Sequence, residues 1–312
     1  MRFLCRALLK FLYWTKQRFF PNFTVTHVIP FWNRILYRLV LGAKGPTNFE
    51  EDILGHKMYL DEHDSLQLSI HKIYEPAETS FFREHVQEGM VILDVGANIG
   101  YYTLQFARAA GAKGRVYAFE PDPENFKLLQ KNVQLNGYTN VILIPKAVSD
   151  VTGTLKLYSS PENKGDHKIY DSGEARQPIN IESTRLDDYF EAQKTPVDLI
   201  KMDIQGAEYR ALLGTQGVLR RNPHATVVTE FWPSGLKRSG ASAAGFLDLL
   251  LAQEFDLFEI REAHAGVEPV NRAYLLGKYR EDRPVDMTNL MCRRDPAKAG
   301  RAREEATKIP AA

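Results

Sequence analysis

The stretch "VILDVGANIGYYTL", residues 91–104, constrains the fold most strongly. Its first five residues are typical of a buried strand, and the residues after Gly100 follow a helical pattern. The turn between them contains two glycines, which allow the unusual dihedral angles and the close approach that a ligand on the turn requires. Backbone amides at the start of the following helix can bind a negative group. The stretch therefore predicts a strand, a turn and a helix that hold a nucleotide-like ligand.

Runs typical of buried strands alternate with helical patterns from about residue 50 onwards. Such alternation indicates a parallel sheet with helices on both faces. We therefore predict an α/β fold that is Rossmann-like and doubly wound, with a mainly parallel sheet of seven strands. The strands are expected at residues 91–95, 115–121, 141–145, 198–203, 225–231, 256–260 and 288–293. Helices are expected at residues 100–110, 123–137 and 243–255, a hairpin at 149–160 and a polar loop at 161–178.

Charge divides the chain into segments. Residues 1–49 contain eight Lys and Arg and no acid, so they carry +8 and the remainder carries −7. Basic and apolar residues segregate around a helix at residues 1–11, which predicts a basic amphipathic extension. Two interpretations stay open, a helix packed on the domain and peripheral membrane contact through residues 1–44. We expect the extension at 1–49, the α/β domain at 50–293 and a flexible tail at 294–312.

The bulk composition excludes several classes of protein. A formal net charge of +1 argues against a nucleic-acid binder. The two cysteines, Cys5 and Cys292, suggest neither a disulfide framework nor a zinc cluster, so a reducing compartment fits. Lys10 interrupts the apolar start and no small-residue cleavage site follows, so we do not expect export. We expect a cytoplasmic protein, with peripheral association at the inner face of a membrane as the alternative.

The spacing within the turn separates two kinds of cofactor. A dinucleotide fingerprint that starts at Gly96 requires glycine at positions 98 and 101, but the chain has Asn98 and Tyr101. A pyrophosphate site is therefore disfavoured. The pattern Asp-x-Gly-x-Asn-x-Gly instead resembles the first motif of class I S-adenosylmethionine-dependent methyltransferases.

An acid lies at the end of the second predicted strand. Glu120 lies 24 residues beyond Gly96, and a carboxylate there can accept hydrogen bonds from both ribose hydroxyls of a nucleoside. A solvated acid at a strand end is the alternative. Asp122 lies just before the helical pattern, and we expect it to cap that helix.

Several further blocks of sequence, read in order, make the resemblance specific. They cover residues 74–231, about half of the chain, and resemble the FkbM family of methyltransferases. One departure is Gln205 in "KMDIQGAE", where the family commonly has an acid. The blocks are "YEPAETSFFREHVQEGMVILDVGANIGYYTL", "VYAFEPDPENFKLLQKNVQLNG", "KAVSDVTGTLKLY", "STRLDDYF", "VDLIKMDIQGAEYRALLG" and "VVTEF".

The resemblance implies a cofactor, S-adenosylmethionine, and residues that bind it. Glu120 would hold the ribose, and Ala147 would lie near the adenine. No metal is expected, because His71, His85 and His167 are isolated in the sequence and we expect surface or structural roles for them. The residues implied to surround the methionine part are Asp94, Gly96, Asn98 and Gly100.

Methyl transfer needs few catalytic groups, because the cofactor already carries an activated methyl group. The protein aligns the acceptor and, for a hydroxyl, removes its proton. The candidates are Asp203 and Glu230, which lie at the ends of central strands, and Glu208, which follows Asp203 by five residues. Capping of the next helix is the alternative for Asp203, and a favourable interaction with the helix dipole is the alternative for Glu208. A divalent metal held by these acids is a further alternative.

The sequence therefore predicts a class I methyltransferase that acts on a small-molecule or glycan acceptor. The resemblance implies methylation of a hydroxyl oxygen on a sugar, glycan or secondary metabolite. A methyltransferase for an amine or protein acceptor is one alternative, and a non-catalytic module that binds S-adenosylmethionine is another. The oligomeric state is left open.

Overall fold

The structure is a computed structural model, and it describes residues 50–160, 163–171, 173, 176–192, 195–261 and 266–295. The predictions for residues 1–49 and for the tail beyond residue 295 lie outside this part of the chain. The proposed segment boundaries stay predictions. Among the described residues, no helix combines the length and the apolar character needed to cross a membrane.

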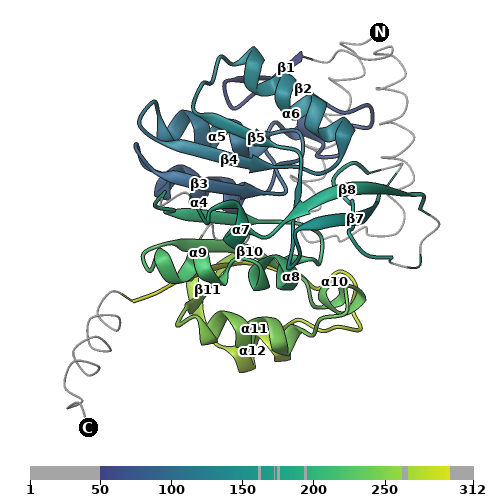
Figure 1. Ribbon diagram of the computed structural model, residues 1–312, viewed down its shortest axis with the longest axis vertical. Coiled ribbons are helices and arrows are strands. Elements are labelled where there is room, and N and C mark those ends of the chain that lie inside the picture. The colour runs from purple at the N-terminus through teal and green to yellow at the C-terminus, as the bar shows by residue number, and fades with distance from the viewer. Residues whose placement is uncertain are drawn as a thin grey trace, which may run out of the picture. The chain divides into compact units, whose positions relative to one another are not determined.

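A mixed sheet of eight strands forms the centre of the domain (Figure 1). Its order is β12-β11-β13-β10-β9-β3-β4-β5, and the five strands from β10 to β5 are parallel. The prediction of seven strands is wrong, because the described sheet has one more. The additional strand is β12, which lies at the edge of the sheet, pairs with β11 and carries Glu268 and Pro269. Proline is tolerated at a sheet edge, and this polar sequence gives little strand signal. The bounds are β3 Val91–Val95, β4 Arg115–Phe119, β5 Val141–Ile144, β9 Leu199–Met202, β10 Thr226–Phe231, β11 Asp256–Arg261, β12 Gly266–Val270 and β13 Thr288–Arg293.

The chain changes direction across the sheet between β3 and β9. It enters at β3, moves outwards through β4 to β5, and then returns to the other side of β3 with β9 and β10. The connection after β3 therefore leads towards β4, whereas the connection after β9 leads the opposite way, towards β10. In open parallel sheets, ligands bind beyond the carboxyl ends of the strands at such a switch point.

Helices cover both faces of the sheet, which explains why the parallel strands are continuous apolar runs. On one face, α4, α5 and α6 pack on side chains such as Ile92. On the other face, α7, α8, α9, α11 and α12 pack on side chains such as Leu93. The helices are α3 Leu68–His71, α4 Pro76–His85, α5 Tyr101–Ala110, α6 Pro123–Leu135, α7 Leu186–Tyr189, α8 Glu208–Leu213, α9 Gln216–Arg221, α10 Pro233–Arg238, α11 Ala243–Ala252 and α12 Arg272–Lys278.

A second sheet of three strands, β6 (Ala147–Val148), β7 (Gly153–Tyr158) and β8 (Pro178–Thr184), lies beside the end of β5 (Figure 1). The hairpin predicted within residues 149–160 is wrong. Residues 149–152 are occupied by a bend, so only β7 forms there, and its antiparallel partner β8 comes after the polar loop. The polar loop therefore starts and ends on one small sheet.

A short hairpin at the start of the domain is anchored on α6. It consists of β1 (Glu50–Ile53) and β2 (His56–Tyr59). The side chain of Asn132 on α6 bonds both the N–H and the carbonyl of Tyr59, at 2.6 and 3.0 Å. Its Nδ2 also donates to the carbonyl of Ile99 at 2.8 Å, so this one amide joins the hairpin, α6 and the turn after β3.

The turn after β3 touches the end of β9 so closely that only glycine fits. Gly96 has φ +81°, and a Cβ there would lie 2.1 Å from the carbonyl oxygen of Asp203. Gly89 has a similar φ of +89°, but a Cβ there would meet nothing within 4 Å. The two glycines thus share a left-handed backbone and differ in packing.

We predict that Gly96→Ala lowers the free energy of unfolding much more than Gly89→Ala does. The matched variant Gly89→Ala carries only the conformational cost of about 1–2 kcal/mol. Gly96→Ala adds a steric cost of about 1–3 kcal/mol, because the backbone of β9 must move. Urea unfolding of both variants measures the difference. Equal losses would mean that the two strand ends can separate without cost.

Candidate active site

Four neighbouring strands are in register near their carboxyl ends, and β10 continues to Phe231. Val95 pairs with Phe119 and with Met202, and Met202 pairs with Thr229. The next residue on each strand therefore forms one row across the carboxyl edge of the sheet. In spatial order, from β4 to β10, the row is Glu120, Gly96, Asp203 and Glu230.

A cavity lies against this row, between the turn after β3 and the polar loop. The predicted site residues that line it are Gly96, Asn98, Glu120, Ala147 and Asp203. The other four, Asp94, Gly100, Glu208 and Glu230, lie outside its lining. Neighbouring strands are about 4.8 Å apart, so Glu120 and Glu230 are separated by roughly 14 Å of sheet edge. One ligand group therefore cannot contact both acids.

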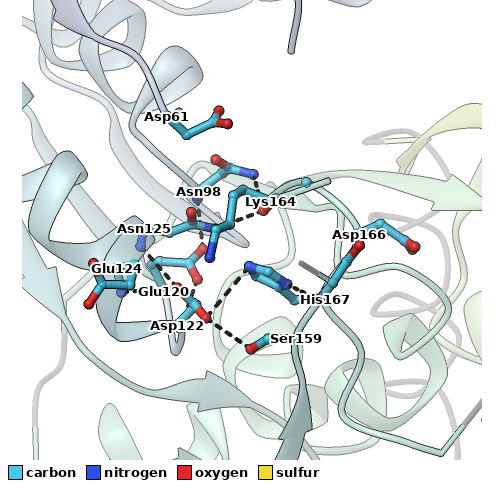
Figure 2. A network of polar contacts seen from close by, with 12 residues as sticks. Asp61, Asn98, Glu120, Asp122, Glu124, Asn125, Ser159, Lys164, Asp166 and His167 are labelled. Carbon is cyan, nitrogen blue, oxygen red and sulfur yellow. Dashed lines mark hydrogen bonds and ion pairs between the residues drawn. The ribbon is translucent and has the colours of Figure 1, made fainter. Parts of the chain in front are cut away.

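Glu120 joins the turn after β3 to the start of α6 (Figure 2). Its two carboxyl oxygens accept hydrogen bonds from the backbone N–H of Asn98 at 2.8 Å and of Asp122 at 2.9 Å. Asp122 caps α6, as predicted, because its Oδ1 accepts from the N–H groups of Glu124 and Asn125. Each oxygen of Glu120 keeps a second lone pair that can accept from a ligand.

Burial raises the pKa of Glu120 to about 8, although the N–H groups of Asp122 and Asn98 favour the charged form. Only 5% of the residue's surface is exposed. For the unliganded protein, an acid with a raised pKa contributes stability that is present below about pH 4.5 and is lost as the pH rises to about 8. A ligand that donates hydrogen bonds to the carboxylate acts in the opposite direction.

Lys201 on β9 connects the strand ends behind the cavity. Its Nζ lies 3.3 Å from the carbonyl oxygen of Gly96, 3.6 Å from Asp203 and 3.8 Å from Asp94. Burial by itself would lower the pKa of Lys201, but the carboxylates of Asp203 and Asp94 outweigh it and raise the pKa. Lys201 therefore stays charged and holds the two neighbouring strand ends together.

The other two glycine-motif residues lie beneath the turn. Asp94 is fully buried, and its Oδ2 accepts a hydrogen bond from the hydroxyl of Thr103 on α5. Gly100 precedes α5 with φ +95°, and a Cβ there would lie 2.9 Å from the side chain of Leu129 on α6. These contacts fix the position of α5 relative to β3 and α6.

Glu208 closes the turn that follows β9. Its Oε1 accepts from the N–H of Ile204 at 2.9 Å and from the N–H of Gly206 at 3.3 Å. The side chain is buried, and burial raises its pKa to about 7. Through these hydrogen bonds, Glu208 stabilises the turn that carries Asp203 and Gln205.

Glu230 ends the row on the side away from Glu120. Only 8% of the residue is exposed, and among the residues that the structure describes its Oε2 has no hydrogen-bond partner. Burial raises the pKa of Glu230 well above its usual value, and the nearby carboxylates of Asp203 and Glu208 raise it further. A buried oxygen without a partner is unusual, so it requires an explanation such as a ligand.

The buried carboxyl groups around Lys201 outnumber this one buried cation. Burial and the charge of Asp203 raise the pKa of Glu75, which precedes α4. Burial and Glu75 raise the pKa of Glu78. Lys201 acts in the opposite direction on both groups. The excess of acid suits a ligand that carries positive charge, as the sulfonium of S-adenosylmethionine does.

His167 is one of the three histidines for which the sequence predicted surface or structural roles. Its side chain is 7% exposed and lines the same cavity as Glu120. A surface role is therefore wrong. The residue belongs to the polar loop between β7 and β8, and a loop of that length is often functional, which is the one sequence signal that pointed to it.

A switch-point cavity, a glycine turn and an acid at the end of the neighbouring strand define a nucleotide-type cofactor site in a doubly wound domain. Comparison with known proteins identifies the family. The model of the methyltransferase FkbM domain matches residues 94–257, which is more than half of the chain. The chain belongs to this family and is an S-adenosylmethionine-dependent methyltransferase.

Curated relatives are similar over the same region. The chain is 32% identical over 177 residues to 2-O-methyltransferase NoeI of Sinorhizobium fredii, covering 51% of this chain and 70% of that protein. It is 29% identical to Methyltransferase sdnD of Sordaria araneosa, over 47% of this chain and 68% of the relative. It is 30% identical to Hexuronic acid methyltransferase AglP of Haloferax volcanii, over 44% and 54%.

We predict that binding of S-adenosylhomocysteine strengthens as the pH rises from about 6 to 8. Glu120 must lose its proton to accept from the ribose hydroxyls, so the affinity should rise by up to about tenfold per pH unit and level off above its pKa of about 8. Isothermal titration calorimetry at several pH values measures this. At pH 8, Glu120→Ala should weaken binding by about 1.5–3 kcal/mol.

The matched control is Glu124→Ala, which removes an exposed acid of α6 that pairs with Lys127. It should leave both the affinity and its pH dependence unchanged. If Glu120→Ala kept the affinity of the wild type, Glu120 would have no contact with the ligand.

Proposed function

We propose that this methyltransferase transfers the methyl group to a hydroxyl oxygen of a sugar, a glycan or a secondary metabolite. Two relatives support this acceptor class, since one is a 2-O-methyltransferase and another a hexuronic acid methyltransferase. The observation that carries the proposal is the unpartnered carboxyl oxygen of Glu230 at the far end of the row. A hydroxyl acceptor needs such a group to take its proton.

In the proposed reaction, residues at one end of the row bind the cofactor and a residue at the other end accepts the proton. When bound, S-adenosylmethionine supplies a methyl group that is already activated by positive charge on sulfur. Glu120 and the turn at Gly96 orient the nucleoside at one end. Glu230 accepts the proton of the acceptor hydroxyl at the other end, through Oε2. Asp203 lies between them in the row.

Glu230 is a better candidate for the base than Asp203. The Oδ1 of Asp203 accepts from Gln205 at 3.1 Å, and its Oδ2 faces Lys201 at 3.6 Å, so both oxygens have partners. Glu230 has a free oxygen and a raised pKa, and a carboxylate of higher pKa is the stronger base once it is ionised. Lys201 favours that ionised form.

We predict that Glu230→Gln lowers kcat by about 100-fold to 10,000-fold, the usual contribution of a positioned base. Cofactor affinity should stay near that of the wild type, because Glu230 lies outside the cavity lining. The wild-type rate should rise with pH as Glu230 ionises, and this dependence should be absent in the variant. Single-turnover rates with an acceptor from a panel of sugars and glycans provide the measurement.

The matched control is Glu88→Gln, an exposed acid paired with Lys113. A Glu230→Gln rate within about threefold of wild type, less than ~1 kcal/mol in the barrier, would show that Glu230 is not the base. Methyl transfer to amine acceptors in the same panel, with none to hydroxyls, would contradict the proposed acceptor class.

A further inference from the structure

Residues 163–171, which we call the crossing segment, border the cavity from the side of the polar loop. The carbonyl of Lys164 accepts hydrogen bonds from the side-chain amides of Asn98 at 3.3 Å and Asn125 at 2.8 Å. The N–H of Lys164 donates to the hydroxyl of Ser65 at 2.8 Å. At the other end, the hydroxyl of Tyr170 donates to the carbonyl of Gln205 at 2.8 Å. The segment is therefore fixed to the turn after β3, to α6 and to the turn after β9.

His167 is held in one orientation within the crossing segment (Figure 2). Its Nδ1 accepts a hydrogen bond from the backbone N–H of Ser160 at 3.0 Å. An Nδ1 that accepts must carry a lone pair, so the proton of the neutral ring lies on Nε2. Burial lowers the pKa of His167, although Asp122 acts in the opposite direction, and the neutral ring is the form expected at pH 7.

Within the described part of the chain, the Nε2 of His167 has no hydrogen-bond partner. The Oδ2 of Asp122 lies 3.5 Å from it and already accepts from the hydroxyl of Ser159 at 3.1 Å. The side chain is only 7% exposed, so water replaces the missing partner poorly. A buried N–H without a partner is costly, and natural proteins rarely keep one without a reason.

We propose that His167 is a cofactor-binding residue whose Nε2–H donates a hydrogen bond to the nucleoside end of S-adenosylmethionine. The position of His167 favours contact with the nucleoside end. The residue faces Asp122, two residues beyond Glu120, and lines the same cavity as Glu120 and Ala147. Ribose oxygens and adenine nitrogens are acceptors that match a neutral N–H donor. The proposal does not depend on the identity of the methyl acceptor.

The alternative is that His167 only anchors the crossing segment through Ser160. Two substitutions separate these roles. In His167→Asn, the amide oxygen can replace Nδ1 and keep the bond from Ser160, but no donor reaches the position of Nε2. In His167→Gln, the amide nitrogen reaches approximately as far as Nε2 and keeps the donor. A purely structural role would make the asparagine variant the milder change.

The test measures the affinity of S-adenosylhomocysteine and of 5′-methylthioadenosine, which contains only the nucleoside end, by calorimetry. We expect His167→Asn to weaken both ligands by the same factor of about 3 to 12, the loss of one net hydrogen bond. His167→Gln should stay within about threefold of wild type. The control His224→Asn changes a half-exposed histidine that pairs with Asp198 outside the cavity and should have no effect.

Thermal unfolding without ligand accompanies each titration. An asparagine variant with wild-type affinity for both ligands would overturn the proposal, whatever its melting temperature. A loss seen with S-adenosylhomocysteine but not with 5′-methylthioadenosine would also overturn it, since the contact would then lie at the amino-acid end. Should the asparagine variant fail to fold, a glutamine variant that melts normally but binds about tenfold more weakly would contradict the donor role.

Discussion

The alignment of four strand ends is the constraint on which the site depends. Because β4, β3, β9 and β10 are paired in register, Glu120, Gly96, Asp203 and Glu230 fall into one row, the first three just beyond their strands and Glu230 near the end of β10. Glycine occupies the row at position 96, where the carbonyl of Asp203 leaves no room for a Cβ. The close contact fixes the turn after β3 against the end of β9, beside the cavity that Glu120 and Asp203 line. Backbone pairing thus sets the distance between Glu120 and Glu230.

Electrostatics in this site is dominated by buried carboxyl groups around Lys201. The lysine fixes Gly96, Asp94 and Asp203, yet the pKa values of Glu75 and Glu230 stay raised. A cation that enters the region makes ionisation of these acids easier. The excess of acid therefore favours a positively charged sulfonium over the neutral thioether that is left after methyl transfer.

The sequence predicted the parts of the fold that follow from strong local patterns. The strand at 91–95, the helix after Gly100 and the cap at Asp122 have clear periodicity or capping signals, and the structure confirms them. The edge strand β12 and the pairing of β7 with β8 were missed, because a polar edge and a long-range partner leave little local trace. His167 could not be identified for a similar reason. Its burial and its unpartnered nitrogen arise only when the crossing segment meets α6.

A crystal structure of the protein with S-adenosylhomocysteine bound tests the central claim most directly. The account predicts that the ribose hydroxyls lie within about 3.2 Å of the Glu120 carboxylate, and that the sulfur lies over the row between Gly96 and Glu230. The homocysteine end should point towards Asp203 and Lys201. A ligand seated elsewhere, or with its ribose directed away from Glu120, would contradict the assignment of the strand-end row as the cofactor site.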